Sequence, residues 1–529
     1  MRAFSRGVLW CGVPLLIASF DASAAVPKPT CRSSDKVETG ISGETTAADV
    51  SSGANLVGFN CNIDLVGKVQ GEGASWQHTA WKNCSYYDQA QNPTGLVSPG
   101  TVVVDVSNPA SPVITDHLTD PSMLDPWESL KVNPARQLLA GDQQPSTGFS
   151  IYDISGDCRH PVLKSSINIP GSSGHAGQWA PDGKTYYITT ILAVPSLVAV
   201  DTTDVTNPTP ILQWSPPAGS GINGNPIYHD LEFSKDGNIA YQTAIGGFGV
   251  QGADTNGLVI LDVSDIQQRR ANPTIRILGS VSWDDGSIIA QNALPITIAG
   301  KSYVLFTDEL GAGGFGPTAG AAACAAGKSN AGFPRLIDVS DPAHPTVVSK
   351  LQLEVADPAN CNRVQNGIPM TGHTPFGDGI PLFGYSCHYC NVDDVDNAKL
   401  AACSCFAAGL RVFDISDPLN PKEKAYYKPP AQGAKVLPGS QYYLFAGAGF
   451  SHPVDWAPSK PSFPKDRGMT NGDIWTTFQD NGFAALRLYT PPAADNSGCS
   501  ATGTSSVSLL GLLLVAGMLV SRRRPASRR

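Results

Sequence analysis

A short phrase recurs six times along the chain and constrains its fold more than any other feature. Each copy is a run of apolar residues that ends in Asp. After one intervening residue comes Ser or Thr and then a turn, as in VVVDVSNPASP from Val102 to Pro112. Because Asp and Ser side chains bond nearby backbone amides and Pro presets φ, each copy predicts a strand followed by a tight corner. The aspartates that fix the register are Asp105, Asp153, Asp201, Asp262, Asp338 and Asp414.

The spacing of the copies predicts how the strands assemble. Successive aspartates are 48, 48, 61, 76 and 76 residues apart. Upstream of two copies, WAPDGKTYYI from Trp179 and FSKDGNIAY from Phe233 have the pattern strand, Asp-Gly turn, strand of a β-hairpin. A period of roughly 40 to 50 residues built from strands and turns is typical of a β-propeller with one blade per repeat. We therefore expect an all-β propeller in which the longer spacings are loop insertions.

A degenerate seventh copy lies between Trp456 and Tyr489, where GFAALRLY has lost the Asp. Seven blades is thus the predicted count, with six and eight as the alternatives. The segment from Ile63 to Val69 is a candidate strand that would complete the last blade and close the ring. Closure is expected because it removes exposed sheet edges.

These phrases resemble the LVIVD repeat, most specifically at VVVDVSNPASP, LVILDVSD and RVFDISDPLNP. The resemblance covers about residues 60–490. It implies a β-propeller and a secreted or cell-surface bacterial protein, and it implies no single shared chemistry.

The N-terminus is typical of an export signal. Arg2 and Arg6 precede an apolar run over residues 7–19, and small residues follow up to Ala25. This pattern predicts a signal peptide over residues 1–25, because the run is too short to span a bilayer. A lead-in segment over residues 26–59 and the propeller over residues 60–490 would then lie outside the cytoplasm.

The C-terminus predicts a membrane address. A linker over residues 491–506 precedes a tail over residues 507–529, in which an apolar stretch is followed by five arginines. The pattern resembles bacterial sorting signals of the MYXO-CTERM and GlyGly-CTERM kind, which implies Cys499 as the attachment point. A simple transmembrane anchor is the alternative.

Cysteine usage agrees with export. Ten cysteines remain once Cys11 and Cys499 are set aside with the signal and the tail. An even number in an oxidising compartment predicts disulfides, whose connectivity the spacing does not give. One cluster could instead be a zinc ligand set, although the exported context favours disulfides; it consists of Cys387, Cys390, Cys403 and Cys405.

Four of the nine histidines share one position in the repeat, four residues before the hairpin position of Trp179: His175, His229, His388 and His452. Glu128 takes this position in the second blade. Equivalent positions in a propeller are related by rotation, so we expect these side chains to form a partial ring in the central channel. Imidazoles that converge in this way can bind copper, zinc or iron, with Glu128 as a further ligand or a proton acceptor.

This arrangement is distantly similar to that of selenium-binding protein and methanethiol oxidase propellers. Those proteins use channel histidines to bind a metal, so the resemblance implies a metal site in the channel here. A structural role is the alternative. Repeated histidines also bridge strands or blades by hydrogen bonds, and His229 is followed by Asp230 as such a bridge would require.

Two functions follow from these observations. The first is a monomeric, surface-anchored scaffold that binds a protein or a glycan, and the alternative is a metal-dependent oxidoreductase or hydrolase with its site in the channel. The net charge of -9 argues against nucleic acid or an anionic membrane surface as the main partner.

Overall fold

The computed structural model describes residues 25–71, 73–74, 76–89, 100–190, 195–217, 227–245, 256–312, 319–366, 384–431, 473–478 and 481–489. The chain divides into two compact units, residues 1–489 and 490–529, and every described residue belongs to the first. The predicted signal peptide up to residue 24, the linker, the C-terminal tail, Cys499 and His452 lie outside the described residues.

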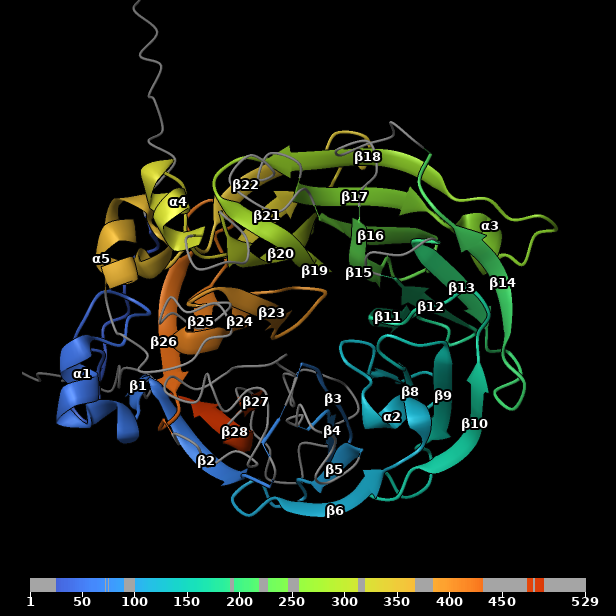
Figure 1. The fold of residues 1–529 in the computed structure, drawn as a ribbon, viewed down its shortest axis with the longest axis horizontal. Helices are drawn as coiled ribbons and strands as arrows, with labels where there is room; N and C mark the ends of the chain where they lie inside the picture. The colour runs from blue at the N-terminus through green and yellow to red at the C-terminus, as the bar shows by residue number, and fades with distance from the viewer. Residues whose placement is uncertain are drawn as a thin grey trace, which may run out of the picture. The chain divides into compact units, whose positions relative to one another are not determined.

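Seven antiparallel sheets are arranged around a central axis (Figure 1), which confirms the predicted seven-bladed propeller. In each four-stranded blade the strands follow the chain from the axis to the rim. The first three blades comprise β3 (His78–Trp81), β4 (Cys84–Tyr87), β5 (Thr101–Asp105) and β6 (Val113–Leu118); β7 (Lys131–Asn133), β8 (Leu138–Asp142), β9 (Gly148–Asp153) and β10 (Val162–Asn168); and β11 (Ala176–Trp179), β12 (Thr185–Thr189), β13 (Leu197–Asp201) and β14 (Thr209–Trp214).

The fourth to seventh blades include the longer insertions. Two strands of the N-terminal segment, β1 and β2, also belong to these blades. The four blades comprise β15 (Ile227–Phe233), β16 (Ile239–Ile245), β17 (Asn256–Asp262) and β18 (Arg276–Trp283); β19 (Ser287–Ile298), β20 (Lys301–Gly311), β21 (Pro334–Asp338) and β22 (Thr346–Lys350); β23 (Cys387–Val392), β24 (Leu400–Cys405), β25 (Gly409–Asp414), β26 (Lys422–Lys428) and β1 (Phe59–Cys61); and β27 (Asp473–Phe478), β28 (Gly482–Leu488) and β2 (Ile63–Val69).

The repeated phrase forms the third strand of each of the first six blades. Each register aspartate ends that strand and accepts a hydrogen bond of 2.8–3.1 Å from the backbone N–H two residues later. The carboxylate therefore turns the chain into the corner that leads to the outer strand, as the sequence predicts.

Ring closure depends on the N-terminal segment. Strand β2 pairs antiparallel with β28 over Ile63↔Leu488 to Val69↔Phe483, so residues from the two ends of the first unit share the seventh blade. This confirms the predicted closing strand. In addition, β1 pairs with β26 from Phe59↔Lys428 to Cys61↔Tyr426 and adds a fifth strand to the sixth blade, which the sequence analysis did not predict.

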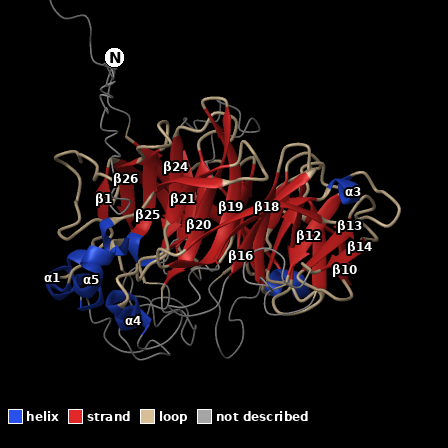
Figure 2. Ribbon diagram, turned by 90° about the horizontal axis from the view of Figure 1, so that it is seen from above, coloured by secondary structure: helices blue, strands red, loops and turns tan. Residues whose placement is uncertain are grey.

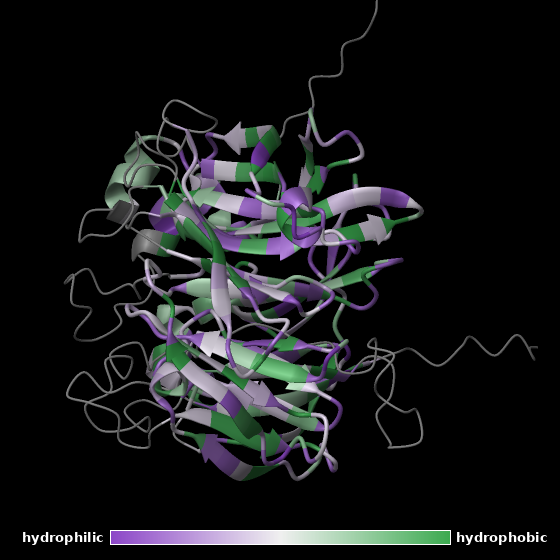
Figure 3. Cartoon of the chain, turned by 90° about the vertical axis from the view of Figure 1, so that its right-hand side faces the viewer, coloured by the Kyte–Doolittle hydropathy of each residue, from purple (hydrophilic) through white to green (hydrophobic). Residues whose placement is uncertain are grey.

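The hydrophobic core is divided into clusters that lie between blades. Seven clusters of buried side chains each join two neighbouring blades, including the junction of the seventh with the first. In β5, Val102 and Val104 pack toward the seventh blade, whereas Val103 packs toward the second. Both faces of these strands are buried, which is why they are continuous apolar runs. The outer strand β18 alternates in exposure instead. Figure 3 shows hydrophilic and hydrophobic residues mixed along the strands that face the viewer.

Short helices lie outside the sheets and contribute little to the ring. Figures 1 and 2 show α1, α4 and α5 together beside the sixth blade. Among the described residues no helix is both long and apolar enough to cross a membrane. The helical segments are α1 (Ala47–Ser52), η1 (Ala54–Leu56), α2 (Pro121–Leu124), α3 (Ser264–Gln267), α4 (Ala319–Ala325), η3 (Glu354–Ala356), η4 (Pro358–Asn360), α5 (Cys361–Asn366) and η5 (Phe406–Ala408).

The ten cysteines of the described residues form five disulfides. Two of them, Cys387–Cys405 and Cys390–Cys403, join β23 to β24 side by side, which confirms disulfides for this cluster and leaves no free thiolate in it for zinc. The other three are Cys31–Cys61, Cys84–Cys158 and Cys324–Cys361.

The contact between the closing strand and the first blade gives a test of ring closure. Gly67 of β2 lies against the corner that follows β5, where an added Cβ would be 2.3 Å from the Pro109 carbonyl oxygen and 2.7 Å from the Ala110 carbonyl carbon. We expect Gly67→Ala to lower the free energy of unfolding by about 1–3 kcal/mol, because the backbone must move to admit the methyl group. Denaturant unfolding measures this difference.

Gly156→Ala is the matched control, because an added Cβ there has no neighbour within 4 Å. Equal stability of the two variants would contradict the tight packing of β2 against the first blade.

Candidate metal centre

The sequence-predicted ligands converge from four blades. Glu128 lies before β7 and bridges to Ala176 at the start of β11, and His175 immediately precedes that strand. His229 is in β15 and His388 is in β23. The structure thus brings together four of the five residues that the repeat position predicts, and the fifth, His452, lies outside the described residues.

Two imidazoles and one carboxylate oxygen form the first half of the cluster. His175 Nε2 lies 2.9 Å from His229 Nε2. Glu128 Oε2 lies 3.3 Å from each of these two nitrogens. Two ligand atoms with metal bonds of about 2.1 Å are separated by about 3.0 Å at a right-angled site and about 3.4 Å at a tetrahedral one. All three separations therefore fit atoms that share one ion.

His388 forms the second half with the other oxygen of Glu128. Its Nε2 lies 2.9 Å from Glu128 Oε1 and 3.3 Å from Glu309 Oε2. Glu309 Oε1 is 4.0 Å from His229 Nε2, so this second carboxylate reaches toward both halves.

Glu309 was missed by the sequence analysis because it does not occupy the repeated position. It lies on β20, the second strand of the fifth blade, whereas the predicted ligands come from innermost strands or the residues just before them. One signal could have identified it: Asp308 and Glu309 are consecutive carboxylates within the otherwise apolar run YVLFTDEL. Carboxylates are rarely buried unless they are paired or bind a metal.

All five side chains are buried, with His388 0%, His229 1% and Glu128 2% exposed. Burial lowers the pKa of His229 to about 3, so its imidazole is neutral at physiological pH. Burial opposes charge on His388 as well, but hydrogen bonds to Glu128 and Glu309 outweigh it and raise the pKa of His388 to about 9. Burial alone would raise the pKa of Glu128, yet the imidazoles hold it well below its usual range. The ionised Glu128 carboxylate therefore faces a neutral imidazole at His229, the form that binds a metal, whereas His388 carries a proton that a bound ion would displace.

Glu128 Oε2 distinguishes this cluster from a self-contained hydrogen-bond network. This buried oxygen has no hydrogen-bond partner within the described residues, although two imidazole nitrogens lie 3.3 Å away. A buried carboxylate oxygen without a hydrogen bond is costly unless a cation binds it.

Neighbouring groups hold the imidazoles in place. His175 Nδ1 lies 3.1 Å from Gln144 Oε1, and donation from Nδ1–H to this amide leaves the Nε2 lone pair directed at Glu128 and His229. His388 lies between Cys387 and Cys390, where the pairing of β23 with β24 shifts register. The two disulfides therefore fasten the irregular segment that carries His388 on both sides.

An aromatic layer lies against the imidazoles. Trp127 is 4.8 Å from Trp76 and 5.8 Å from His175, and Phe406 is 5.1 Å from His388, measured between ring centroids. An apolar layer of this kind limits solvent access to a bound ion and lowers the local dielectric.

The backbone is strained at two points next to the cluster. Trp127, directly before Glu128, has φ 48°, and Ile289 at the start of β19 has φ 58°. Bulky and β-branched residues rarely adopt this left-handed conformation, and such strain is retained where surrounding structure requires it, commonly at functional sites.

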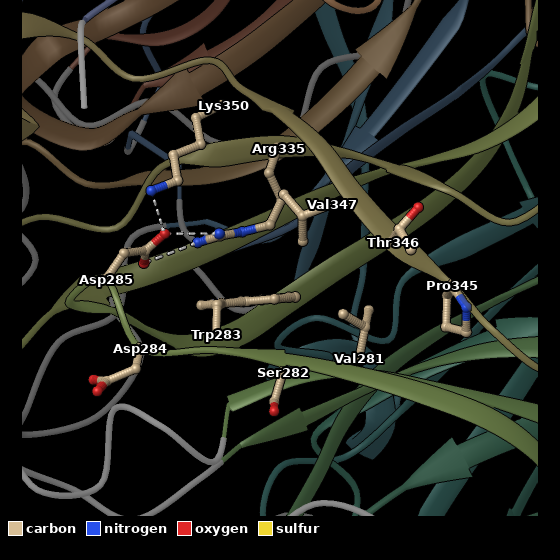
Figure 4. A pocket seen from close by; sticks show the side chains of 10 residues that line it. All are labelled: Val281, Ser282, Trp283, Asp284, Asp285, Arg335, Pro345, Thr346, Val347 and Lys350. Atoms are coloured by element: carbon tan, nitrogen blue, oxygen red, sulfur yellow. Dashed lines mark hydrogen bonds and ion pairs between the residues drawn. The ribbon is translucent and has the colours of Figure 1, made fainter. Parts of the chain in front are cut away.

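A separate pocket of about 460 Å³ opens on the surface between the fourth and fifth blades (Figure 4). Arg335 lies across its wall, paired with Asp285 at 3.0 Å and with its guanidinium carbon 3.9 Å from the centroid of the Trp283 ring. Lys350 also pairs with Asp285, at 2.9 Å. The main charges of this pocket therefore neutralise one another, whereas in the central cluster Glu128 Oε2 has no hydrogen bond among the residues that the structure describes.

Comparison with known proteins supports the fold. Four segments match the LVIVD repeat, residues 98–119, 252–268, 335–352 and 404–428. They contain β5, β17, β21 and β25, the third strands of the first, fourth, fifth and sixth blades. No curated protein matches the chain in sequence.

Several solved structures are similar in structure to this chain at low sequence identity. The β-propeller domain of Myceliophteria thermophila Cps50 (Swd1) is 11% identical, with a TM-score of 0.47 over 81% of this chain and 100% of that one. A hypothetical selenium-binding protein from Sulfolobus tokodaii is 14% identical, with a TM-score of 0.48 over 78% and 94%. Kuenenia stuttgartiensis hydrazine synthase is 12% identical, with a TM-score of 0.46 over 79% and 97%. By its seven antiparallel sheets and its four repeat matches, the chain is a seven-bladed β-propeller that contains LVIVD repeats.

Proposed function

We propose that this propeller is an exported metalloprotein that binds copper, zinc or iron at its centre. The ligands are His175, His229, His388, Glu128 and Glu309. The observation that carries the proposal is Glu128 Oε2, a buried carboxylate oxygen that has no hydrogen bond within the described residues and lies 3.3 Å from each of two imidazole nitrogens. Imidazole and carboxylate together suit zinc, copper and iron.

The reaction class depends on the ion. Zinc would act as a Lewis acid toward water or a carbonyl oxygen, which is hydrolase chemistry, whereas copper or iron would add electron transfer, which is oxidoreductase chemistry. The protein's own contribution is to hold the ligands in a fixed, dry geometry through the disulfides at His388 and the aromatic layer.

The location rests on separate observations. Five disulfides and the LVIVD repeats support an extracellular protein, since disulfides persist in oxidising compartments. Attachment to a membrane through the C-terminal tail is part of the proposal.

Elemental analysis of the exported protein, purified without a His-tag, tests the metal site. We expect bound transition metal in the wild type and its loss in a His229→Ala, His388→Ala double variant, because each half of the cluster loses an imidazole. Circular dichroism checks that the variant stays folded.

His344→Ala is the matched control, since that side chain is 81% exposed and pairs only with Asp341 among the described residues; this variant should keep its metal. Wild-type protein that is free of metal after supply with copper, zinc and iron would overturn the proposal and leave the histidines as links between blades.

A second proposed function is the surface scaffold that the sequence first suggested, binding a protein or a glycan. The observation in its favour is the pocket of Figure 4, whose lining includes the exposed polar side chains of Ser282, Asp284 and Thr346. Hydroxyl and carboxylate groups of this kind suit the hydroxyl groups of a glycan.

Thr346→Val tests this function because it keeps the shape of an exposed pocket side chain and removes its hydroxyl group. We expect affinity for a glycan selected on an array to fall by about 2- to 10-fold, the value of one neutral hydrogen bond. Thr209→Val, at the equivalent exposed position on the outer strand of the third blade, is the control. Equal affinity of the two variants would rule out the pocket as the glycan site.

A further inference from the structure

We propose that the centre holds two metal ions bridged by the carboxylates of Glu128 and Glu309. This inference rests on the proposed metal-binding function and deepens it. It is carried by the way in which the ligand atoms divide between the two oxygens of Glu128.

The ligand atoms form two groups that share Glu128 but use different oxygens. His175 Nε2 and His229 Nε2 face Oε2, each at 3.3 Å. His388 Nε2 faces Oε1 at 2.9 Å. The two oxygens of a carboxylate diverge from one carbon, and each is directed here at its own set of nitrogens. One ion on the Oε2 side would leave Oε1 and His388 to be satisfied separately.

Glu309, on β20, connects the same two groups of ligand atoms. Its Oε2 lies 3.3 Å from His388 Nε2, and its Oε1 lies 4.0 Å from His229 Nε2. Two carboxylates that each present one oxygen to each group have the arrangement of bridging ligands. Ions in two-metal sites lie about 3.5–4 Å apart, which a pair of bridging carboxylates can span.

Three polar side-chain atoms surround His388 Nε2 in the second group. This nitrogen has Glu128 Oε1 at 2.9 Å, Glu309 Oε2 at 3.3 Å and Gln291 Nε2 at 3.0 Å. A ring nitrogen carries either one proton or one lone pair, so it cannot donate to carboxylates and also accept from an amide N–H.

Turning the Gln291 amide over removes the conflict, since its oxygen and nitrogen are interchangeable in shape, and places three oxygens around His388 Nε2. A single N–H is shared poorly among three oxygens, whereas an ion in place of that proton binds all three together with the nitrogen. Gln291 Oε1 has no hydrogen-bond partner within the described residues in its present orientation. The second ion would thus have four protein ligands: His388 Nε2, Glu128 Oε1, Glu309 Oε2 and Gln291 Oε1.

The first ion would have fewer protein ligands than the second. His175, His229 and Glu128 supply three ligand atoms, with Glu309 Oε1 farther away. Three protein ligands leave a coordination position open, which is typical of catalytic sites, whereas closed four-ligand sites are structural. The inference therefore assigns different roles to the two ions.

Metal stoichiometry tests this inference. Folded full-length exported protein is stripped of metal, titrated with Zn²⁺ and analysed for bound zinc per chain. We expect two equivalents in the wild type and in His344→Ala, and one equivalent in Glu309→Gln and in His388→Ala, which keep the first group intact.

Loading with Cu²⁺ gives an independent readout. Two Cu²⁺ ions bridged by carboxylates couple magnetically, so the electron paramagnetic resonance signal of the wild type should account for much less than its total copper. In Glu309→Gln the signal should account for all of it.

The outcomes separate the two proposals. One equivalent of zinc in the wild type, unchanged in Glu309→Gln, with a copper signal equal to total copper, would overturn the two-ion inference and leave the metal-binding function intact. No bound metal in the wild type would overturn both. Since His388→Ala and Glu309→Gln remove different side chains from the same ion, a folding defect in one variant leaves the other to decide.

Discussion

Each blade buries both of its faces against its neighbours, and the rest of the structure depends on this mutual burial. Every one of the seven hydrophobic clusters draws side chains from two blades, so a single sheet would expose two apolar faces to water. The arrangement is complete only when the last blade meets the first. Pairing of β2 with β28 joins the ends of the first unit in that last blade, and the geometry at the axis follows from it.

Much of the fold could be predicted because its signals are local. The Asp-x-Ser corner is formed by one carboxylate and the backbone N–H two residues later, so each copy specifies its own turn wherever it lies in the chain. The repeated histidine position was informative for a different reason: rotation about the axis carries one position of the repeat onto the next. This symmetry is why His175, His229 and His388 meet although 213 residues separate the first from the last.

What could not be predicted depends on contacts without a repeat. Glu309 reaches the axis from a second strand, and no register relates it to the histidines. Strand β1 has three residues, too few for a pattern, and its place on the sixth blade is set by pairing with β26 far along the chain. Cys84 and Cys158 join the first two blades across 74 residues, a pairing that spacing does not reveal.

The origin of the ligands has a consequence for how the protein holds together. The second, third, fourth, fifth and sixth blades each supply a side chain to one cluster, and Glu128 contacts His388 across 260 residues of chain. Metal bound in this cluster links five blades at the axis. Because the ligands separate when any of these blades detaches, the free energy of metal binding adds to the free energy of unfolding of the ring. The metal centre would then act as a hub that couples the stability of blades that share no sheet.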